Sequence, residues 1–258
     1  MNNVNKTLYI PLFAKSFVSK KGLFIKDEYA EKIWDAEGFA LRGRAKSKWL
    51  SYYLGIRARV FDDWVKERCL IDEDAAVIHI GCGLDSRALR VGVGNRWYDV
   101  DFPEVIAERR RYFEESGRYR MLEGDAASPV WLNDVAERSA IVVMEGVSMY
   151  IPEDALCGLF SALSERFERV YILMDAYSRF AARMSKYKNP IKEVGVTRTY
   201  GLDEPKRLEA GEISFLGQKD MTPEEHIDEL SGMERRIFKK LYAGKTARGL
   251  YRIYEYEK

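Results

Sequence analysis

The sequence predicts an α/β protein built on a doubly wound parallel sheet, and three observations lead to this fold class. Short runs of continuously apolar residues recur between residues 76 and 175, as expected of strands that are covered on both faces. Segments with helical start signals separate these runs, which is the alternation typical of parallel α/β sheets. The first run is followed at once by Gly81-Cys82-Gly83, a sharp turn of the kind that opens a nucleotide-binding corner.

The chain has 258 residues, enough for one large domain, and no Pro/Gly/Ser-rich linker divides it, so a single domain over residues 1–258 is expected. Its 42 basic and 41 acidic side chains nearly cancel, which argues against a nucleic-acid partner and against binding to an anionic membrane. Two short basic runs, Lys46-Ser47-Lys48 and Arg109-Arg110-Arg111, are therefore interpreted as solvated helix faces.

No apolar run is long enough to span a bilayer, and the first residues lack a signal-peptide pattern. Three cysteines, an odd number, do not suggest a disulfide framework and favour a reducing, cytoplasmic location. With only two histidines, a histidine-rich metal site is not expected. His79 stands inside the first apolar run and is interpreted as a core residue.

Residues 1–70 are predicted to form a helical cap, because apolar and aromatic residues recur there at helical spacing. Asp27 suits the N-cap of a helix through Trp34, and a second helix is expected from Trp49 to Cys69. The first strand follows this segment, so residues 75–258 are expected to supply the sheet.

Strands and helices then alternate along the chain. The predicted strands span residues 76–80, 96–101, 119–122, 140–144, 169–174, 213–216 and 248–256. The predicted helices span residues 85–90, 103–115, 129–137, 152–166, 204–210 and 223–242, the last as a helical insertion near residues 220–245. Pro103 and Pro152 suit the first turn of the helices that they open. Asp85 and Ser86 are expected to cap the helix that ends at Arg90.

Four of the predicted strands are followed by a carboxylate or end in one: Asp101, Asp125, Glu145 and Asp175. Ligands of open α/β sheets bind outside the carboxyl ends of the strands, so these acids are expected to converge on one crevice. Asp101 stands at the distance from the glycine turn that is expected of an acid binding ribose hydroxyls. Asp125 could accept a hydrogen bond from the exocyclic amine of adenine, although Asp125 and Asp175 each fit a capping role as well.

Nicotinamide-dependent dehydrogenases and S-adenosylmethionine (SAM)-dependent methyltransferases both use this layout. The dehydrogenase fingerprint has a third glycine at the position that Ser86 occupies here, which favours the methyltransferase. A tight turn in an ordinary α/β domain would carry the same two glycines. Cys82 lies beside a predicted helix N-terminus, where the pKa of a thiol can fall, but a structural thiol is favoured over a catalytic one.

The chain resembles the leucine carboxyl methyltransferase family, including its bacterial branch of polyketide-type O-methyltransferases, in three ordered motifs: IHIGCGLDSRALR, WYDVDFPEVIAERRRYF and MEGVSMYIPEDAL. It also resembles the leading helices of that family in TLYIPLFAKS, KDEY and IRARVFDDWV. The resemblance extends from about Thr7 to Asp175, with a weaker match in YGLDEPKRLE and the last strand. It implies a class I SAM-dependent methyltransferase with a Rossmann-like sheet, parallel except for an antiparallel last strand, and with the helical cap over the crevice.

The resemblance also implies a SAM site, with S-adenosyl-L-homocysteine as the product. Its implied cofactor-binding residues are Lys15, Arg57, Gly81, Cys82, Gly83, Asp101, Asp125, Ala126 and Glu145. The glycine turn would pass under the methionine part of SAM, and Asp101 would bind the ribose. Asp125 and Ala126 would lie at the adenine, while Glu145 would face the amino-acid part.

The carboxylate of SAM would pair with Arg57 and Lys15, since an arginine fork matches a carboxylate. On the acceptor side, the resemblance implies Tyr150 and Arg179 as substrate-binding or catalytic residues. The C-terminal third of the chain matches the family poorly, and the choice of acceptor is expected to reside there.

The expected reaction is methyl transfer to an oxygen of a small molecule, either a carboxylate or an acidic hydroxyl. A carboxylate is ionised at pH 7 and needs no general base, which fits the scarcity of histidines. Two further functions remain alternatives: a protein methyltransferase acting on a C-terminal leucine carboxylate, and a SAM-binding interaction module without catalysis. A nicotinamide-dependent dehydrogenase is the third alternative.

Overall fold

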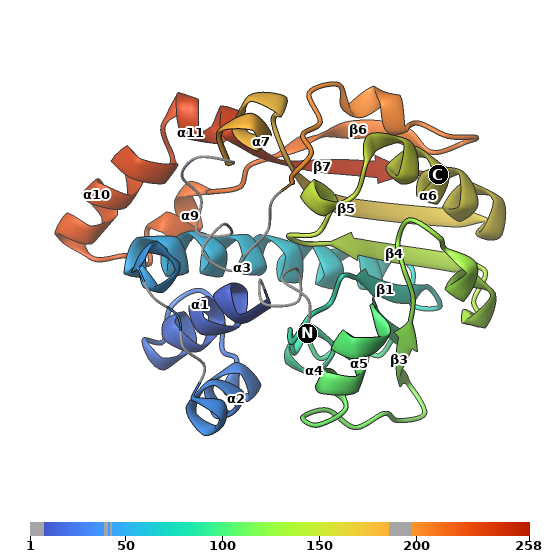
Figure 1. The fold of residues 1–258 in the computed structure, drawn as a ribbon, viewed down its shortest axis with the longest axis horizontal. Coiled ribbons are helices and arrows are strands. Elements are labelled where there is room, and N and C mark those ends of the chain that lie inside the picture. Colours follow the sequence, from blue (N-terminus) through green and yellow to red (C-terminus); the bar gives the residue numbers. More distant parts are fainter. Residues whose placement is uncertain (1–7, 39–40, 42, 186–197) are drawn as a thin grey trace.

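The computed structural model describes residues 8–38, 41, 43–185 and 198–258 (Figure 1), so Thr7, where the resemblance begins, lies outside the described residues. Within these residues seven strands form one sheet in the order β3-β2-β1-β4-β5-β7-β6. The strands are β1 Ala76–Ile80, β2 Trp97–Asp101, β3 Tyr119–Glu123, β4 Ser139–Met144, β5 Arg169–Tyr177, β6 Ser214–Lys219 and β7 Tyr251–Glu257.

The directions of the strands confirm the predicted fold class. The strands β3, β2, β1, β4 and β5 are parallel to their neighbours. The last strand, β7, enters antiparallel between β5 and β6. The chain therefore forms a Rossmann-like sheet that is mostly parallel and has an antiparallel last strand.

Helices account for most of the remaining described chain. The N-terminal helices α1 Tyr9–Lys20, α2 Glu28–Glu37 and α3 Lys48–Ile71 precede the sheet, as predicted, and α3 extends across the molecule beside the strands (Figure 1). The later α-helices are α4 Arg87–Arg90, α5 Pro103–Arg109, α6 Glu153–Arg166, α7 Arg179–Ser185, α9 Glu224–Ile227, α10 Gly232–Tyr242 and α11 Lys245–Leu250. The 3-10 helices are η2 Gly43–Lys46, η3 Val130–Asp134, η4 Ser148–Tyr150 and η5 Pro205–Leu208.

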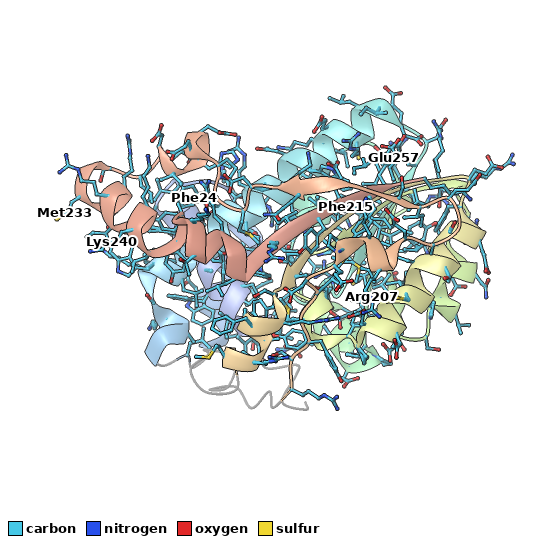
Figure 2. All side chains as sticks on the ribbon, turned by 90° about the horizontal axis from the view of Figure 1, so that it is seen from above. Phe24, Arg207, Phe215, Met233, Lys240 and Glu257 are labelled. Carbon is cyan, nitrogen blue, oxygen red and sulfur yellow. The ribbon has the colours of Figure 1, made fainter. Side chains whose placement is uncertain are left out.

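Alternate residues of the strands pack into two different cores, as the two-residue period of a strand requires. On β1, Val77 packs with the N-terminal helices, whereas Ile78 and Ile80 pack with α6 on the opposite face. Both faces of the sheet are thus covered, which explains why its strands are apolar along their whole length. The segment α9–α11 lies between β6 and β7 in the chain, and Figure 2 shows α10, with Met233 and Lys240, at the end of the molecule far from Glu257.

Several predicted helices are shorter in the structure. The helix expected over residues 103–115 ends at Arg109, because Phe113 turns into the core and the chain reverses at the bridge between Ser116 and Tyr119. The helix expected over residues 129–137 is only the 3-10 turn η3, and the stretch 223–242 is divided into α9 and α10. None of the helices in the described parts of the chain combines the length and the apolar character that crossing a bilayer requires.

The boundaries of the C-terminal strands also differ from the predictions. β5 continues to Tyr177, so Asp175 lies within the strand and not at its end. The reason is the pairing with β7, which matches Asp175 with Ile253 and Tyr177 with Tyr251. The strand expected from residue 248 begins at Tyr251, because residues 245–250 form α11.

Candidate cofactor and acceptor site

A cavity of about 480 Å³ lies where the carboxyl ends of β1, β2 and β4 meet α1 and α3. This volume is typical of small-molecule sites in proteins. The cavity is lined by all nine implied cofactor residues: Lys15, Arg57, Gly81, Cys82, Gly83, Asp101, Asp125, Ala126 and Glu145. Three of the four acids that were predicted to converge, Asp101, Asp125 and Glu145, therefore meet at one crevice.

The glycine turn after β1 adopts a conformation that strongly favours glycine. The backbone φ angles of Gly81 and Gly83 are +68° and +52°, in the left-handed region that other residues rarely adopt. A Cβ atom on Gly81 would lie only 2.5 Å from Cγ2 of Val147. The turn thus brings bare backbone to the wall of the cavity, in close contact with the loop after β4.

Asp101 ends β2 next to this turn. Its carboxylate accepts hydrogen bonds from the backbone N–H of Gly83 and from that of Phe102, both at 2.8 Å. Burial raises the pKa of Asp101 from its ordinary 3.8 to about 6, although these hydrogen bonds act in the opposite direction. The group therefore titrates just below neutral pH.

This pKa gives a testable pH dependence. If Asp101 accepts hydrogen bonds from both ribose hydroxyls, SAM binds the ionised carboxylate. Lowering the pH from 7 to 5 then protonates about nine-tenths of the group and is expected to weaken SAM binding about tenfold. Titration calorimetry across this range measures the effect, and Asp101→Asn should remove this pH dependence. A profile that is identical in the two proteins would contradict the assignment.

For the ligand-free protein, the contribution of Asp101 to the free energy of unfolding is expected to increase as the pH falls, whereas SAM binding weakens. The folded-state pKa of Asp101 lies above the unfolded one, so the folded protein binds more protons between pH 4 and pH 6. This group therefore lowers stability as the pH rises through that window, and its unfavourable contribution is complete above about pH 6.

Arg109 supports the glycine turn from behind, contrary to the sequence interpretation of its basic run as solvated. Its guanidinium is fully buried and donates to the carbonyl oxygens of Gly83, at 2.8 Å, and Asp85, at 2.7 Å. It also forms an ion pair with Asp99 of β2. The side chains of the next two residues of the run are 43% and 52% exposed, as predicted. The sequence does contain a signal for the burial of Arg109. The residues four and three positions before it, Val105 and Ile106, are apolar and lie on the same face of the helix.

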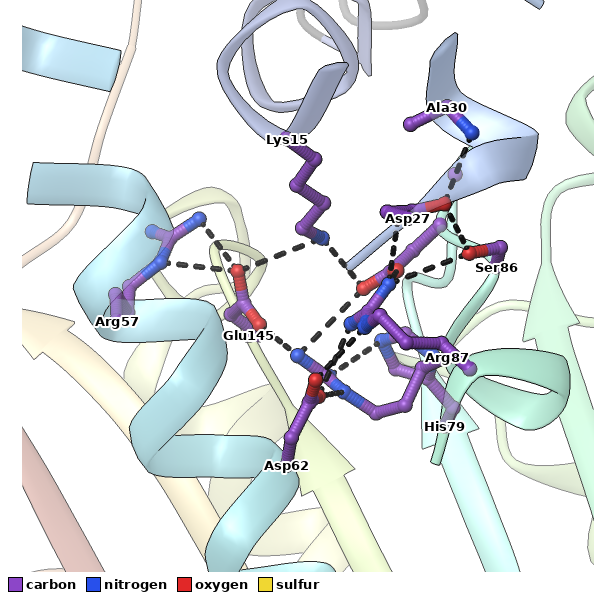
Figure 3. A network of polar contacts seen from close by, with 12 residues as sticks. Lys15, Asp27, Ala30, Arg57, Asp62, His79, Ser86, Arg87 and Glu145 are labelled. Atoms are coloured by element: carbon purple, nitrogen blue, oxygen red, sulfur yellow. Dashed lines mark hydrogen bonds and ion pairs between the residues drawn. The ribbon is translucent and has the colours of Figure 1, made fainter. Parts of the chain in front are cut away.

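A buried ionic network joins the N-terminal helices to the loops of the sheet (Figure 3). Lys15 Nζ lies 2.5 Å from Asp85 Oδ2 and 3.8 Å from Glu145 Oε1. Glu145 is also paired with Arg57 Nη2 at 2.9 Å and with Arg87. Burial alone would raise the pKa of Glu145, but the three cations outweigh it and hold the pKa well below its ordinary value. Glu145 therefore stays ionised at the cavity wall.

The network continues away from the cavity through Asp62, Arg87 and Arg90, to which the sequence analysis gave no role in a site. Arg87 Nε and Arg90 Nε each lie 2.7 Å from Asp62 of α3. Ser86 donates to Asp27 at 2.6 Å, and α4 has no side-chain cap bond. Ser86 does occupy the N-cap position of α4, as the sequence predicted, but the expected side-chain cap bond is absent, because the side chains of Asp85 and Ser86 are taken up by the network.

The remaining candidates occupy different surroundings. Asp125 is exposed at the cavity rim, and its Oδ1 accepts a hydrogen bond from the backbone N–H of Ala127 at 2.8 Å.

Burial raises the pKa of the Cys82 thiol well above its ordinary value, which argues against a catalytic thiolate. His79 is buried, as predicted, and reaches the inner cavity wall. Within the described residues, no group of three metal-binding side chains converges.

Of the two acceptor-side candidates, only Tyr150 lines the cavity. Tyr150 lines the cavity, in a wall that also includes Tyr53, Met149 and Tyr177. Arg179 is not part of the lining. It begins α7, and its side chain, which is 40% exposed, turns to Glu153, with 3.0 Å between Arg179 Nη2 and Glu153 Oε2.

Asp175 does not line the cavity either. It is fully buried beneath Arg57, whose Nη1 lies 3.1 Å from its Oδ2. Tyr251 of β7 does reach the cavity, and sequence reasoning missed it because nothing local distinguishes it from the other tyrosines of that strand.

Comparisons with known proteins identify the relatives of this chain. It is 34% identical over 157 residues to the tetracenomycin polyketide synthesis O-methyltransferase TcmP of Streptomyces glaucescens, a match that covers 60% of this chain and 58% of the relative. It is 26% identical over 236 residues to the SAM-dependent methyltransferase dpfgK of Gibberella zeae, covering 81% and 78%. The chain thus spans little more than half of the first of these relatives.

A similar fold occurs in the crystal structure of a putative methyltransferase from Thermobifida fusca, with a TM-score of 0.55 and 14% identity over 95% of this chain and 94% of that one. The profile of the leucine carboxyl methyltransferase family matches residues 3–164, well over half of the sequence. This match confirms the resemblance in the three motifs: the chain belongs to the leucine carboxyl methyltransferase family.

Proposed function

We propose that the protein transfers the methyl group of SAM to an oxygen of a small molecule, a carboxylate or an acidic hydroxyl, and releases S-adenosyl-L-homocysteine. The observation that carries the proposal is the arrangement of opposite charges around one cavity. Lys15 and Arg57 reach it from the N-terminal helices, and Asp101 and Glu145 from the ends of the strands.

The donor set fits the chemistry of SAM. The amino-acid part of SAM carries an ammonium group and a carboxylate side by side, which match Glu145 and the pair Lys15 and Arg57. A carboxylate that lies beside a glycine turn, such as Asp101, suits the two ribose hydroxyls. Asp125 and Ala126 on the loop after β3 would then face the adenine.

The protein's own contribution to the reaction is positioning. Bound SAM supplies an activated methyl group on a sulfonium, whose sulfur is already a good leaving group. The chain has to hold the acceptor oxygen in line with that methyl group and exclude water from it. The aromatic wall formed by Tyr53, Tyr150 and Tyr177 can hold an apolar acceptor against the methyl group.

The proposal is tested by incubating the protein with SAM and a panel of aromatic acids and phenols, and by following S-adenosyl-L-homocysteine by mass spectrometry. A carboxyl methyl ester releases methanol in mild base, whereas an aryl methyl ether does not, so the same products distinguish the two acceptor groups. A protein that binds no SAM in calorimetry would overturn the proposal.

A second function is favoured by the family itself, whose description names a leucine carboxylate. Peptides ending in leucine, compared with the same peptides amidated at the C-terminus, test this activity. Binding of SAM without turnover of any acceptor would instead support an interaction module. The relatives named above favour the small-molecule acceptor, since one of them is named for polyketide synthesis.

We further propose that the chain works as one unit in the cytoplasm, without nucleic acid or membrane as a partner. The ionic contacts between the N-terminal helices and the loops of the sheet support one unit. The cysteines, Cys69, Cys82 and Cys157, are free thiols, which supports a reducing compartment.

A further inference from the structure

The guanidinium of Arg57 is held at two ends by different acids. Its Nε donates to Glu145 Oε1 at 3.1 Å, on the cavity wall. Its Nη1 donates at 3.1 Å to Asp175 Oδ2 and at 2.6 Å to the hydroxyl of Tyr251. The Tyr251 hydroxyl in turn donates to the same Asp175 oxygen at 2.6 Å. Arg57, Asp175 and Tyr251 thus form a closed triangle of hydrogen bonds.

The triangle is anchored by the sheet. Asp175 is fully buried, and its other oxygen, Oδ1, accepts the backbone N–H of Gly146 at 2.8 Å. Tyr251 begins β7, directly opposite Tyr177 of β5. Its ring packs edge-on against the ring of Tyr177, with 4.7 Å between the two ring centroids. Burial raises the pKa of the Tyr251 hydroxyl well above its ordinary value, so it keeps the proton that it donates to Asp175.

The triangle decides which Arg57 nitrogen is left for a ligand. A guanidinium has five N–H groups in a rigid fork, two of them on Nη1. Asp175 and Tyr251 take up both Nη1 donors, and Glu145 takes the single one on Nε. Nη2, 2.9 Å from Glu145 Oε1, therefore remains as the nitrogen with a donor to spare.

We infer that Tyr251 and Asp175 are positioning residues that hold Nη1 of Arg57 and so present Nη2 to the carboxylate of SAM. The inference rests on the proposed function. It brings the last strand of the chain into the cofactor site, although the family profile matches residues 3–164 only. It also gives the buried Asp175 a role that needs no contact with the ligand.

The test compares two ligands by titration calorimetry: SAM and 5′-methylthioadenosine, which lacks the amino-acid part. Tyr251→Phe removes the hydroxyl and keeps the ring. It is expected to weaken SAM binding about three- to tenfold and to leave the affinity for 5′-methylthioadenosine unchanged. Asp175→Asn, which removes the charge that holds Nη1, is expected to act in the same direction and more strongly.

Tyr254→Phe is the matched control. Tyr254 lies on the same strand and is also buried, but its hydroxyl donates to the carbonyl of Leu202 and accepts from Arg252, so it is not part of the triangle around Arg57. In this variant, the ratio of the affinity for SAM to the affinity for 5′-methylthioadenosine should stay at its wild-type value.

The outcomes separate the inference from the proposed function. A wild-type protein that does not bind SAM overturns the proposed function. Wild-type binding together with equal SAM affinity in Tyr251→Phe overturns the inference alone, as does an equal loss for both ligands, which would mean that Tyr251 acts through folding of the cavity. If Tyr251→Phe does not fold, Asp175→Asn decides by the same ratio.

Discussion

Replacing Arg57 with alanine is expected to weaken SAM binding by about 2–5 kcal/mol, which corresponds to roughly 30- to 5,000-fold in Kd. The loss is large because the carboxylate of SAM would lose one of its two cationic partners in a buried site, where Arg57 is only 5% exposed. Arg57→Lys keeps the charge but not the fork, so its SAM affinity should lie between those of wild type and Arg57→Ala.

The structure shows why this experiment needs two controls. Removing Arg57 also leaves Glu145 without one of its three cations and Asp175 without the cation that pairs with it, and this lowers the stability of the protein. Binding of 5′-methylthioadenosine reports on the fold of the cavity without involving the amino-acid part of SAM. Arg59→Ala, on the same helix but half-exposed and paired with Asp63, should change neither affinity. If Arg57→Ala weakens both ligands equally, Arg57 acts through packing of the helices and does not bind the carboxylate.

Gly81→Val is expected to abolish SAM binding. A valine would have to adopt a φ of +68°, which is strained for a β-branched residue, and its Cβ would collide with Val147. The turn must then shift away from the position where it lines the cavity. Because the collision is with the protein itself, we also expect a clear fall in the unfolding temperature, which differential scanning calorimetry measures.

Gly217→Val provides the comparison for this variant. Gly217 lies in β6, has no positive φ, and has no atom within 4 Å of the position of an added Cβ. This substitution should leave SAM affinity unchanged. Unaltered SAM binding in Gly81→Val would place the cofactor somewhere other than the glycine turn.

The parallel part of the sheet could be predicted from the sequence because its signals are local. A buried strand is apolar along its whole length, so β1 and β4 stand out as runs of aliphatic residues. The left-handed backbone at Gly81 and Gly83 is likewise a local property, and the acid at the end of β2 follows at a fixed distance. These signals were enough to bring Asp101 and Glu145 to the same cavity as the glycines.

The buried charges could not be predicted in the same way, because each depends on a distant partner. Arg109 and Arg110 are neighbours of the same type, yet one is buried against Asp99 and the other is exposed. Asp175 was expected at the end of a strand because its pairing with β7 involves residues more than 70 positions later. Arg179 was carried over from the family motif, but the described structure pairs it with Glu153 outside the cavity.

The ionic network in Figure 3 has a consequence for how this sequence can vary. Asp62 of α3 pairs with both Arg87 and Arg90 of α4, so that opposite charges from two helices compensate one another in the interior. Loss of one member leaves an uncompensated buried charge, whereas replacing the whole group by apolar residues of similar volume need not be harmful. Homologues should therefore conserve or exchange these residues as a set, and single substitutions drawn from a relative should be tolerated only when their partners are transferred with them.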